Sequence, residues 1–197
     1  MDPAELAWVE TNLSVARIAQ LERSPLPGRF DLDHLRAIHR HVFGDVYDWA
    51  GELRTVALGR GAAFCPPDEL AGTAERVFTG LARLGYLRGR RLAPFVEDLT
   101  AFLAALNHLH PFRDGNGRAQ RTFLSQLAVA AGYRIHWTAM DPAENIAASR
   151  AALVDDDLCP LRALLQRLVV PAPRPAPSER QQPPKGVGCE PPRRRSR

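Results

Sequence analysis

Apolar residues recur every three or four positions along most of residues 1–170, which is the spacing of one face of an α-helix. In the clearest example, Leu32, Leu35 and Ile38 follow directly after Asp31, and aspartate is a residue type that caps helix N-termini. A chain with this pattern buries its apolar side chains by packing helices against one another. The pattern therefore predicts an all-α domain.

The same spacing predicts further helices, and prolines or glycines mark where they stop. The first passes through Leu6, Val9, Leu13, Ala16, Ile18 and Leu21 and is broken by SPLPG at 24–28. The others are expected at 68–84, 94–108, 118–131, 142–154 and 160–169, with Gly132 as the stop after 118–131. Between them, residues 44–51 are expected to form a loop whose aromatic side chains pack against the helices.

Residues 52–64, ELRTVALGRGAAF, break the helical pattern. Apolar residues alternate there, a GRG turn follows, and Pro66 and Pro67 end the segment. We predict one small β-hairpin with a glycine-rich turn in an otherwise helical bundle.

Composition excludes several classes of protein. Hydrophobic residues make up 45% of the chain and charged residues 24%, as in ordinary globular domains, and no apolar run is long enough to span a bilayer. The first ten residues carry acids where a signal peptide would carry basic and then apolar residues, so we expect a cytoplasmic protein. Cys65, Cys159 and Cys189 are far apart and odd in number, which argues against a disulfide framework and a zinc site.

The positive charge of the chain is concentrated at its C-terminal end. Residues 171–197 hold seven of the 26 basic residues and two of the 22 acidic ones, so residues 1–170 carry 19 basic and 20 acidic residues. The net charge of residues 1–170 is therefore close to zero, which argues against nucleic-acid binding by this part of the chain. The Pro/Arg-rich tail is expected to be disordered and solvated; the alternative is a weak anchor for an acidic partner or nucleic acid.

The residues HPFRDGNGRAQR, 110–121, gather the side chains and backbone that bind phosphate. Helix N-termini attract anions, and Gly115 and Gly117 let the backbone N–H groups curl around one. Asn116 can add a side-chain donor. Arg118 and Arg121 lie three positions apart, on one face of a first helical turn, with guanidinium forks suited to phosphate oxygens.

The same segment also carries an acid and a base. Asp114 would repel a phosphate by itself, but Mg²⁺ binds a carboxylate together with phosphate oxygens. His110 can accept a proton near neutral pH, and Phe112 is expected to enter the core and fix the shape of the loop. Together they predict a site where a hydroxyl attacks a nucleotide phosphate.

Each of these residues taken singly is more often structural: a helix-end histidine, a plain turn, or a solvated arginine pair. One anion site explains all of them together, whereas the structural interpretation needs several coincidences. Elsewhere in the chain we favour the structural interpretation. His39 and His41 do not share a helix face, Asp155–Asp157 read as a solvated turn, and Trp8, Trp49 and Trp137 are expected in the core.

The segment resembles the Fic-domain signature HxFx(D/E)GNGRxxR at every defined position, and VYDWAGELRTVALGRGAAFCPP is similar to the segment that leads into and through the Fic flap. The resemblance covers roughly residues 30–170. It implies a Fic-type helical bundle at 1–170, with core motif 110–121 and flap 52–66. Most proteins of this family transfer AMP from ATP to a Ser, Thr or Tyr hydroxyl of another protein, which makes them nucleotidyltransferases.

Carried over position by position, the resemblance implies a role for each motif residue. His110 deprotonates the target hydroxyl, Phe112 anchors the loop, and Asp114 holds Mg²⁺ at the α- and β-phosphates. The nucleotide-binding residues it implies are Gly115, Asn116, Gly117, Arg118, Ala119, Gln120 and Arg121, with Arg60 and Gly61 of the flap near the nucleotide. The flap is expected to pair with an extended segment of the target.

Two further features of the sequence bear on this resemblance. Fic relatives that transfer phosphate instead typically have lysine where this chain has Gly117, so the glycine favours AMP transfer. The inhibitory pattern (S/T)xxxE(G/N) is absent, because the one glutamate followed by Gly or Asn, Glu144, has Met140 four residues before it. The chain therefore resembles toxins restrained by a separate small antitoxin that supplies the glutamate.

The target of the transfer is open. Bacterial relatives of this compact type suggest a type II topoisomerase subunit as the protein substrate. A bacterial source is indicated by the basic residues, since Lys185 is the only lysine among them. Two alternatives remain: transfer of UMP, phosphate or phosphocholine, and a nucleotide-binding module without catalysis.

Overall fold

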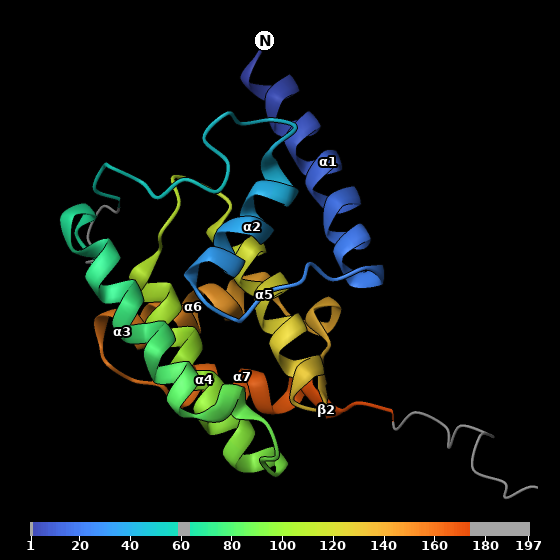
Figure 1. The fold of residues 1–197 in the computed structure, drawn as a ribbon, viewed down its shortest axis with the longest axis vertical. Helices are drawn as coiled ribbons and strands as arrows, with labels where there is room; N and C mark the ends of the chain where they lie inside the picture. The colour runs from blue at the N-terminus through green and yellow to red at the C-terminus, as the bar shows by residue number, and fades with distance from the viewer. Residues whose placement is uncertain (1, 59–63, 174–197) are drawn as a thin grey trace, which may run out of the picture.

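The computed structural model describes residues 2–58 and 64–173, and helices make up most of them (Figure 1). The described α-helices are α1 (Pro3–Arg23), α2 (Leu32–Phe43), α3 (Leu70–Arg83), α4 (Leu92–Leu109), α5 (Asn116–Ala130), α6 (Pro142–Val154) and α7 (Cys159–Leu168). Short 3₁₀ helices lie at Pro67–Glu69, Gly85–Leu87 and Trp137–Ala139. The prediction of an all-α domain is confirmed.

Helix α4 forms the centre of the bundle, because it is apolar on most of its circumference. Eight of its residues are buried: Phe95, Val96, Leu99, Thr100, Phe102, Leu103, Leu106 and Leu109. Helices α3, α6 and α7 pack against it, while α2 packs on α1 and α5 (Figure 1). The C-terminal end of α4 and the N-terminal end of α5 meet at residues 110–115, so the predicted phosphate-binding segment joins two helices of the bundle.

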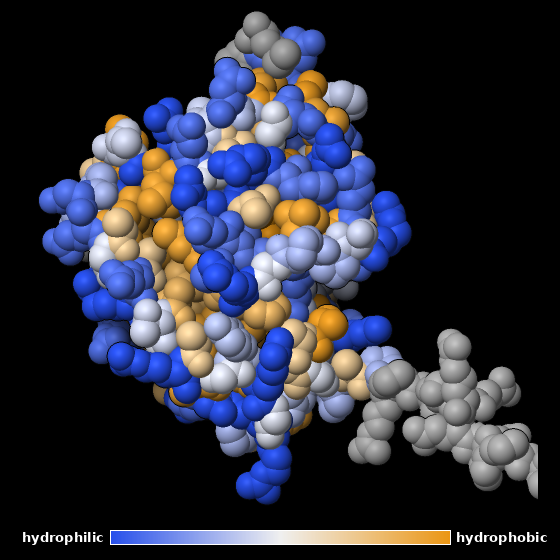
Figure 2. Space-filling model, viewed as in Figure 1, coloured by the Kyte–Doolittle hydropathy of each residue, from blue (hydrophilic) through white to orange (hydrophobic). Residues whose placement is uncertain are grey.

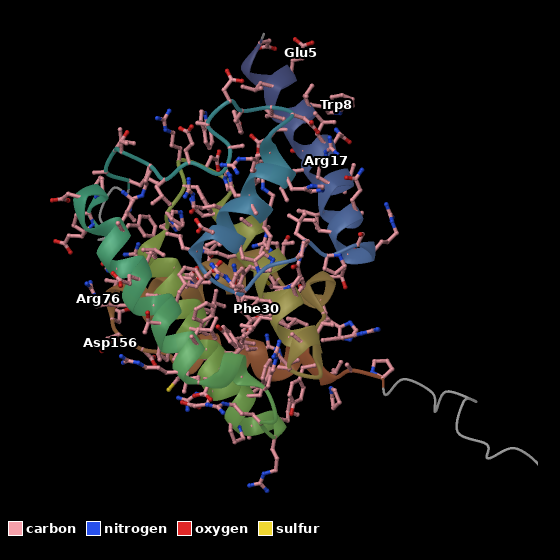
Figure 3. All side chains as sticks on the ribbon, in the orientation of Figure 1. Glu5, Trp8, Arg17, Phe30, Arg76 and Asp156 are labelled. Atoms are coloured by element: carbon pink, nitrogen blue, oxygen red, sulfur yellow. The ribbon has the colours of Figure 1, made fainter. Side chains whose placement is uncertain are left out.

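The sequence located most helices to within a few residues. Helix α6 has the predicted bounds, and α4 extends the predicted 94–108 by one or two residues at each end. Asp31 caps α2 as expected, with its side chain accepting a hydrogen bond from the backbone N–H of His34. Trp8 is an exception: it is 68% exposed and points away from α1, so its expected place in the core is wrong (Figure 3).

The small sheet is not where the sequence predicted it. Strands β1 (Tyr133–Ile135) and β2 (Val169–Pro171) form an antiparallel pair. The described parts of the predicted hairpin, 52–58 and 64–66, contain no strand. Their backbones instead bond to the segment between α4 and α5: the N–H of Arg54 donates to the Pro111 carbonyl, and the N–H of Cys65 donates to the His108 carbonyl, each at 2.9 Å.

Helix α1 is fastened to the loop that follows α2. Arg17 holds Asp45 through two hydrogen bonds, from Nε at 2.7 Å and from Nη2 at 2.9 Å. In that loop, which is residues 44–51 as predicted, the Tyr47 and Trp49 rings stack with their centroids 4.4 Å apart. No helix in the ranges 2–58 and 64–173 is long and apolar enough to cross a membrane.

Candidate functional site

A pocket of about 230 Å³ lies where α4 ends and α5 begins. Its lining comes from one short segment: His110, Arg113, Asp114, Gly115, Asn116, Gly117, Arg118 and Arg121. All but Arg113 were singled out from the sequence. Figure 2 shows one face of the molecule, on which apolar residues gather among polar ones. A second hollow of about 480 Å³ has a more apolar lining that includes Phe30 and Phe78.

The pocket has the backbone of an anion site. Gly115 precedes α5 in the left-handed conformation (φ 72°), and no side chain caps the helix. The unpaired N–H groups of the first helical turn therefore face the pocket, where the helix dipole favours negative charge. A Cβ on Gly115 would lie 2.4 Å from two carbons of the Phe43 ring, so both the backbone conformation and the available space require glycine here.

The two arginines of the motif are in different states. The Arg118 guanidinium donates to the Ser14 hydroxyl at 3.1 Å and to Glu10, and it lies over the Phe43 ring at 4.6 Å from the centroid. No ion pair within the described residues involves Arg121. Burial, and then repulsion by Arg118, lower the pKa of Arg121. Two guanidinium groups that repel each other, of which only Arg118 has an ion pair among the described residues, favour an anionic ligand between them.

The pairing of Glu10 with Arg118 was not predicted. The two residues are 108 positions apart, and the Tyr47 hydroxyl also donates to Glu10. Burial raises the pKa of Glu10, but hydrogen bonds from Tyr47 and Arg118 outweigh this and lower it overall. An ionised Glu10 is thus part of the wall that holds Arg118 beside the pocket.

Buried side chains fix the shape of the loop from behind. Phe112 is fully buried, as predicted, and stacks on His39 with ring centroids 3.8 Å apart. The Asn116 side chain closes the loop on Phe112, accepting from its N–H at 2.9 Å and donating to its carbonyl at 2.8 Å. One amide hydrogen of Asn116 remains for a ligand. The main contribution of Asn116 is therefore to the shape of the loop.

His39 forms a hydrogen bond to the backbone carbonyl of Asp114. Its Nδ1 accepts from the Gly51 N–H at 2.9 Å, so its Nε2 carries the proton and donates to the Asp114 carbonyl at 3.0 Å. Burial lowers the pKa of His39 to about 4, which keeps the ring neutral at physiological pH. The sequence left His39 without a role, because both of its partners lie on other segments.

His110 is the candidate base. It ends α4 in the left-handed conformation (φ 40°, ψ 61°), which is uncommon outside glycine. The Phe64 ring covers it, with centroids 4.1 Å apart and planes inclined by 22°. Burial lowers the pKa of His110 to about 4, although the Asn107 backbone opposes the shift. The ring is therefore neutral near pH 7 and able to accept a proton.

Asp114 is the candidate metal ligand. It is exposed at the pocket, and no group of three or more His, Cys, Asp or Glu side chains in 2–58 and 64–173, at Asp114 or away from it, could hold a metal ion. A single carboxylate beside an anion pocket fits Mg²⁺, which usually combines one or two carboxylates with substrate phosphates and water. It does not fit a metal that needs a closed protein cage.

Some expected nucleotide-binding residues do not reach the pocket. Ala119 and Gln120 are buried, and the Gln120 amide donates to the Leu106 carbonyl at 3.0 Å, so these two side chains face the core of the bundle. Their side chains do not line the pocket, and the expectation that these two residues contact the nucleotide stays a prediction. Arg60 and Gly61, the expected tip of the flap, lie outside the described residues.

Comparisons with known proteins agree with this site. The Fic/DOC family model matches residues 29–128. The protein adenylyltransferase VbhT of Bartonella schoenbuchensis is 40% identical over 149 residues, which are 75% of this chain and 31% of VbhT. The probable protein adenylyltransferase Fic of Escherichia coli is 38% identical over 159 residues, covering 80% of this chain and 78% of that protein. The chain thus spans about a third of the length of VbhT and most of the length of the Escherichia coli protein.

Solved structures show the same fold with adenine nucleotides bound. The Fic domain of a Bartonella quintana effector with bound ADP superposes with a TM-score of 0.83 at 26% identity, covering 87% of each chain. BepC of Bartonella tribocorum with bound AMPPNP gives a TM-score of 0.82 at 25% identity, covering 87% of this chain and 90% of that one.

Proposed function

Because this chain belongs to the Fic/DOC family, we propose that it is a protein adenylyltransferase, transferring AMP from ATP to a Ser, Thr or Tyr hydroxyl of another protein. The observation that carries the proposal is the pocket itself. Twelve consecutive residues bring together a neutral histidine, an exposed carboxylate, a helix N-terminus without a side-chain cap, and an arginine that has no ion pair within 2–58 and 64–173.

His110 is assigned the role of the general base. It takes the proton from the target hydroxyl as the hydroxyl oxygen forms a bond to the α-phosphorus of ATP. The bond from that phosphorus to the bridging oxygen breaks, and pyrophosphate leaves. The neutral state of His110 supports this assignment, because a ring already protonated at pH 7 could not accept the proton.

The other pocket residues are assigned to charge and position. The N-terminal turn of α5 would hold the α-phosphate, and Arg121, with Arg118 behind it, would hold the outer phosphates. Asp114 would hold Mg²⁺, which when bound neutralises charge on the phosphates. Gly117 leaves room above the Arg121 guanidinium, since a Cβ on it would already lie 3.2 Å from Nη1.

We further propose that the chain is a toxin restrained by a separate antitoxin. Its sequence lacks the internal inhibitory pattern. In support, Arg121 has no carboxylate partner in the part of the chain that the structure describes, so a glutamate from a second protein could form an ion pair with it. A type II topoisomerase subunit remains the proposed target by family analogy alone.

Peptide mass spectrometry tests the proposed function. The purified chain is incubated with ATP, Mg²⁺ and a bacterial lysate, and Ser-, Thr- and Tyr-containing peptides are searched for an added AMP. The expected result is AMP on a small number of proteins, absent with His110→Ala. A phosphate or another nucleotide at the same sites would replace this proposal with the corresponding transferase. Bound ATP without any modification would leave a nucleotide-binding module.

A further inference from the structure

Arg54 is a buried cation whose partners are backbone carbonyls. Its side chain is among the largest fully buried ones, with the residue only 2% exposed. It takes part in none of the ion pairs within 2–58 and 64–173. Removing a guanidinium from water without a carboxylate partner is costly, so such a group persists where its hydrogen bonds do something specific.

Those hydrogen bonds join the two arms of the flap to the end of α4. Nη1 donates to the Val56 carbonyl at 2.9 Å, and Nη2 donates to the Cys65 carbonyl, which lies on the other arm. Nε donates to the His110 carbonyl at 2.8 Å, and Nη2 reaches the Leu109 carbonyl at 3.5 Å. One planar group therefore holds three stretches of chain in a fixed relation.

The contact with His110 falls where the backbone is strained. A left-handed residue with a side chain costs about 1–2 kcal/mol, and such conformations persist only where the surroundings hold them. At His110 the N–H donates to Leu106 at 3.0 Å, and the carbonyl accepts from Arg54. The direction of the His110 ring thus depends on a side chain that belongs to the flap.

The flap in turn covers the same ring. Phe64 directly precedes Cys65, whose carbonyl Arg54 holds, and Phe64 stacks on His110. The backbone adds two more ties, from the N–H of residue 54 to Pro111 and from the N–H of Cys65 to His108. Among the described residues, the Arg54 guanidinium is the one side chain that bonds to both the arm carrying Phe64 and the carbonyl of His110, and the two backbone hydrogen bonds hold the same segments together.

We infer that Arg54 is a positioning residue, which sets the placement of His110 and of the flap arms over it as one unit. It is not a catalytic residue, because it binds only main-chain carbonyls of the protein. The inference rests on the proposed function, in that His110 acts as the base. It deepens that function by assigning to a flap residue the alignment of the base with the attacking hydroxyl.

Hydrogen exchange and kinetics test the inference together. In Arg54→Lys the charge stays, but a single ammonium cannot span both flap arms and His110. We expect the amides of residue 54, Cys65 and His110 to exchange at least about tenfold faster, with the amides of α4 and α5 unchanged. The turnover rate for AMP transfer from α-labelled ATP should fall at least about tenfold, while the dissociation constant for AMPPNP and Mg²⁺ stays within about twofold.

Arg36→Lys is the matched control. Arg36 Nε donates to the Gly51 carbonyl at 2.9 Å, so it too holds the loop that leads into the flap, and its other partner is Asp33. The exchange at Cys65 and His110 should not change in this variant. Equal effects of the two substitutions would overturn the inference, as would lost turnover in Arg54→Lys with amide exchange unchanged.

Native-state exchange of the unmodified chain covers the case in which Arg54→Lys does not fold. The amides of Arg54, Cys65 and His110 should open with one common free energy that differs from that of Tyr47 to Gly51. Three separate opening energies would overturn the inference. These exchange measurements do not need catalysis. If the unmodified chain transfers no AMP, the proposed function is refuted, and the exchange data still test whether Arg54 holds the flap arms and His110 together.

Discussion

The ring of Phe64 lies stacked on the ring of His110, with their centroids 4.1 Å apart. The apolar cover keeps water from one face of the base, and burial is the main cause of its low pKa. A base that is hard to protonate stays neutral well below pH 7. The position of Phe64 in the flap should therefore influence the lowest pH at which His110 can act as a base.

Phe64→Ala should raise the pKa of His110 from about 4 toward its ordinary 6.5, because water regains access to the ring. The histidine ring signals followed by NMR across pH measure this directly, with His110→Ala supplying the assignment. Phe64→Leu is the control, since an aliphatic cover should keep the pKa low. The acid limb of kcat/KM should move to higher pH in Phe64→Ala, and a titration midpoint that stays near 4 would contradict the role of the cover.

The stability of the fold should fall in mild acid. The pKa values of His39 and His110 are lowered from 6.5 to about 4, so between these values the unfolded chain binds protons that the folded chain does not. The free energy of unfolding is then largest above pH 6.5 and decreases as pH falls toward 4, by up to about 1.4 kcal/mol per pH unit for each histidine. Urea denaturation at about pH 7 and pH 5 measures it. His39→Gln should remove only part of this dependence, because His110 and His34, whose pKa burial also lowers, keep their contributions; a flat profile in the unmodified chain would contradict the assignment.

Arg118 and Arg121 should respond differently to substitution. Arg121→Ala removes a cation that has no ion pair in the described residues, so ATP affinity should drop by about 10- to 100-fold with little change in stability. Arg118→Ala leaves the largely buried Glu10 without its ion-pair partner and, among the described residues, with only the Tyr47 hydroxyl bound to it, so the free energy of unfolding should fall by about 1–3 kcal/mol. Calorimetric titration with AMPPNP and thermal unfolding of both variants separate the two effects. The opposite ranking in either measurement would show that the assignment of the two arginines is reversed.

Gly115→Ala should cost both stability and nucleotide binding. An alanine here would have to adopt a φ of 72°, and its Cβ would lie 2.4 Å from the Phe43 ring. We therefore expect the free energy of unfolding to fall by at least about 1–2 kcal/mol. Gly80→Ala is the control, because nothing lies within 4 Å of its Cβ and the residue is in the interior of α3. That variant should be stabilised by about 0.5–1 kcal/mol. Thermal unfolding that ranks the two variants the other way would contradict the geometry.

The helices and the motif could be predicted because their signals are local. Asp31 caps a helix whose apolar face the sequence shows. The whole lining of the pocket comes from twelve consecutive residues, of which the sequence analysis did not single out Arg113. Arg113 stands at a variable position of the motif, so the sequence pattern gave no reason to select it. Its guanidinium lies 5.8 Å from the Trp49 ring, a contact from another loop.

The features that the sequence missed all depend on partners far along the chain. The alternation in 52–64 was interpreted as a hairpin, but Arg54 and Cys65 pair with the end of α4. Glu10 is one of several acids on its helix, and only the packing of α1 brings it to Arg118. Such long-range pairs leave no mark in a single sequence, because neither partner has an unusual neighbourhood by itself.

Label transfer from ATP tests whether this chain moves AMP and whether His110 is needed for it. The chain is incubated with Mg²⁺, a bacterial lysate and ATP labelled at either the α- or the γ-phosphate, with His110→Ala alongside. We expect labelled protein from α-labelled ATP alone, and at least about 100-fold less of it with His110→Ala. Label from γ-labelled ATP would mean that the nucleotide lies reversed and the chain transfers phosphate. Undiminished label in the variant would contradict the assignment of His110 as the base.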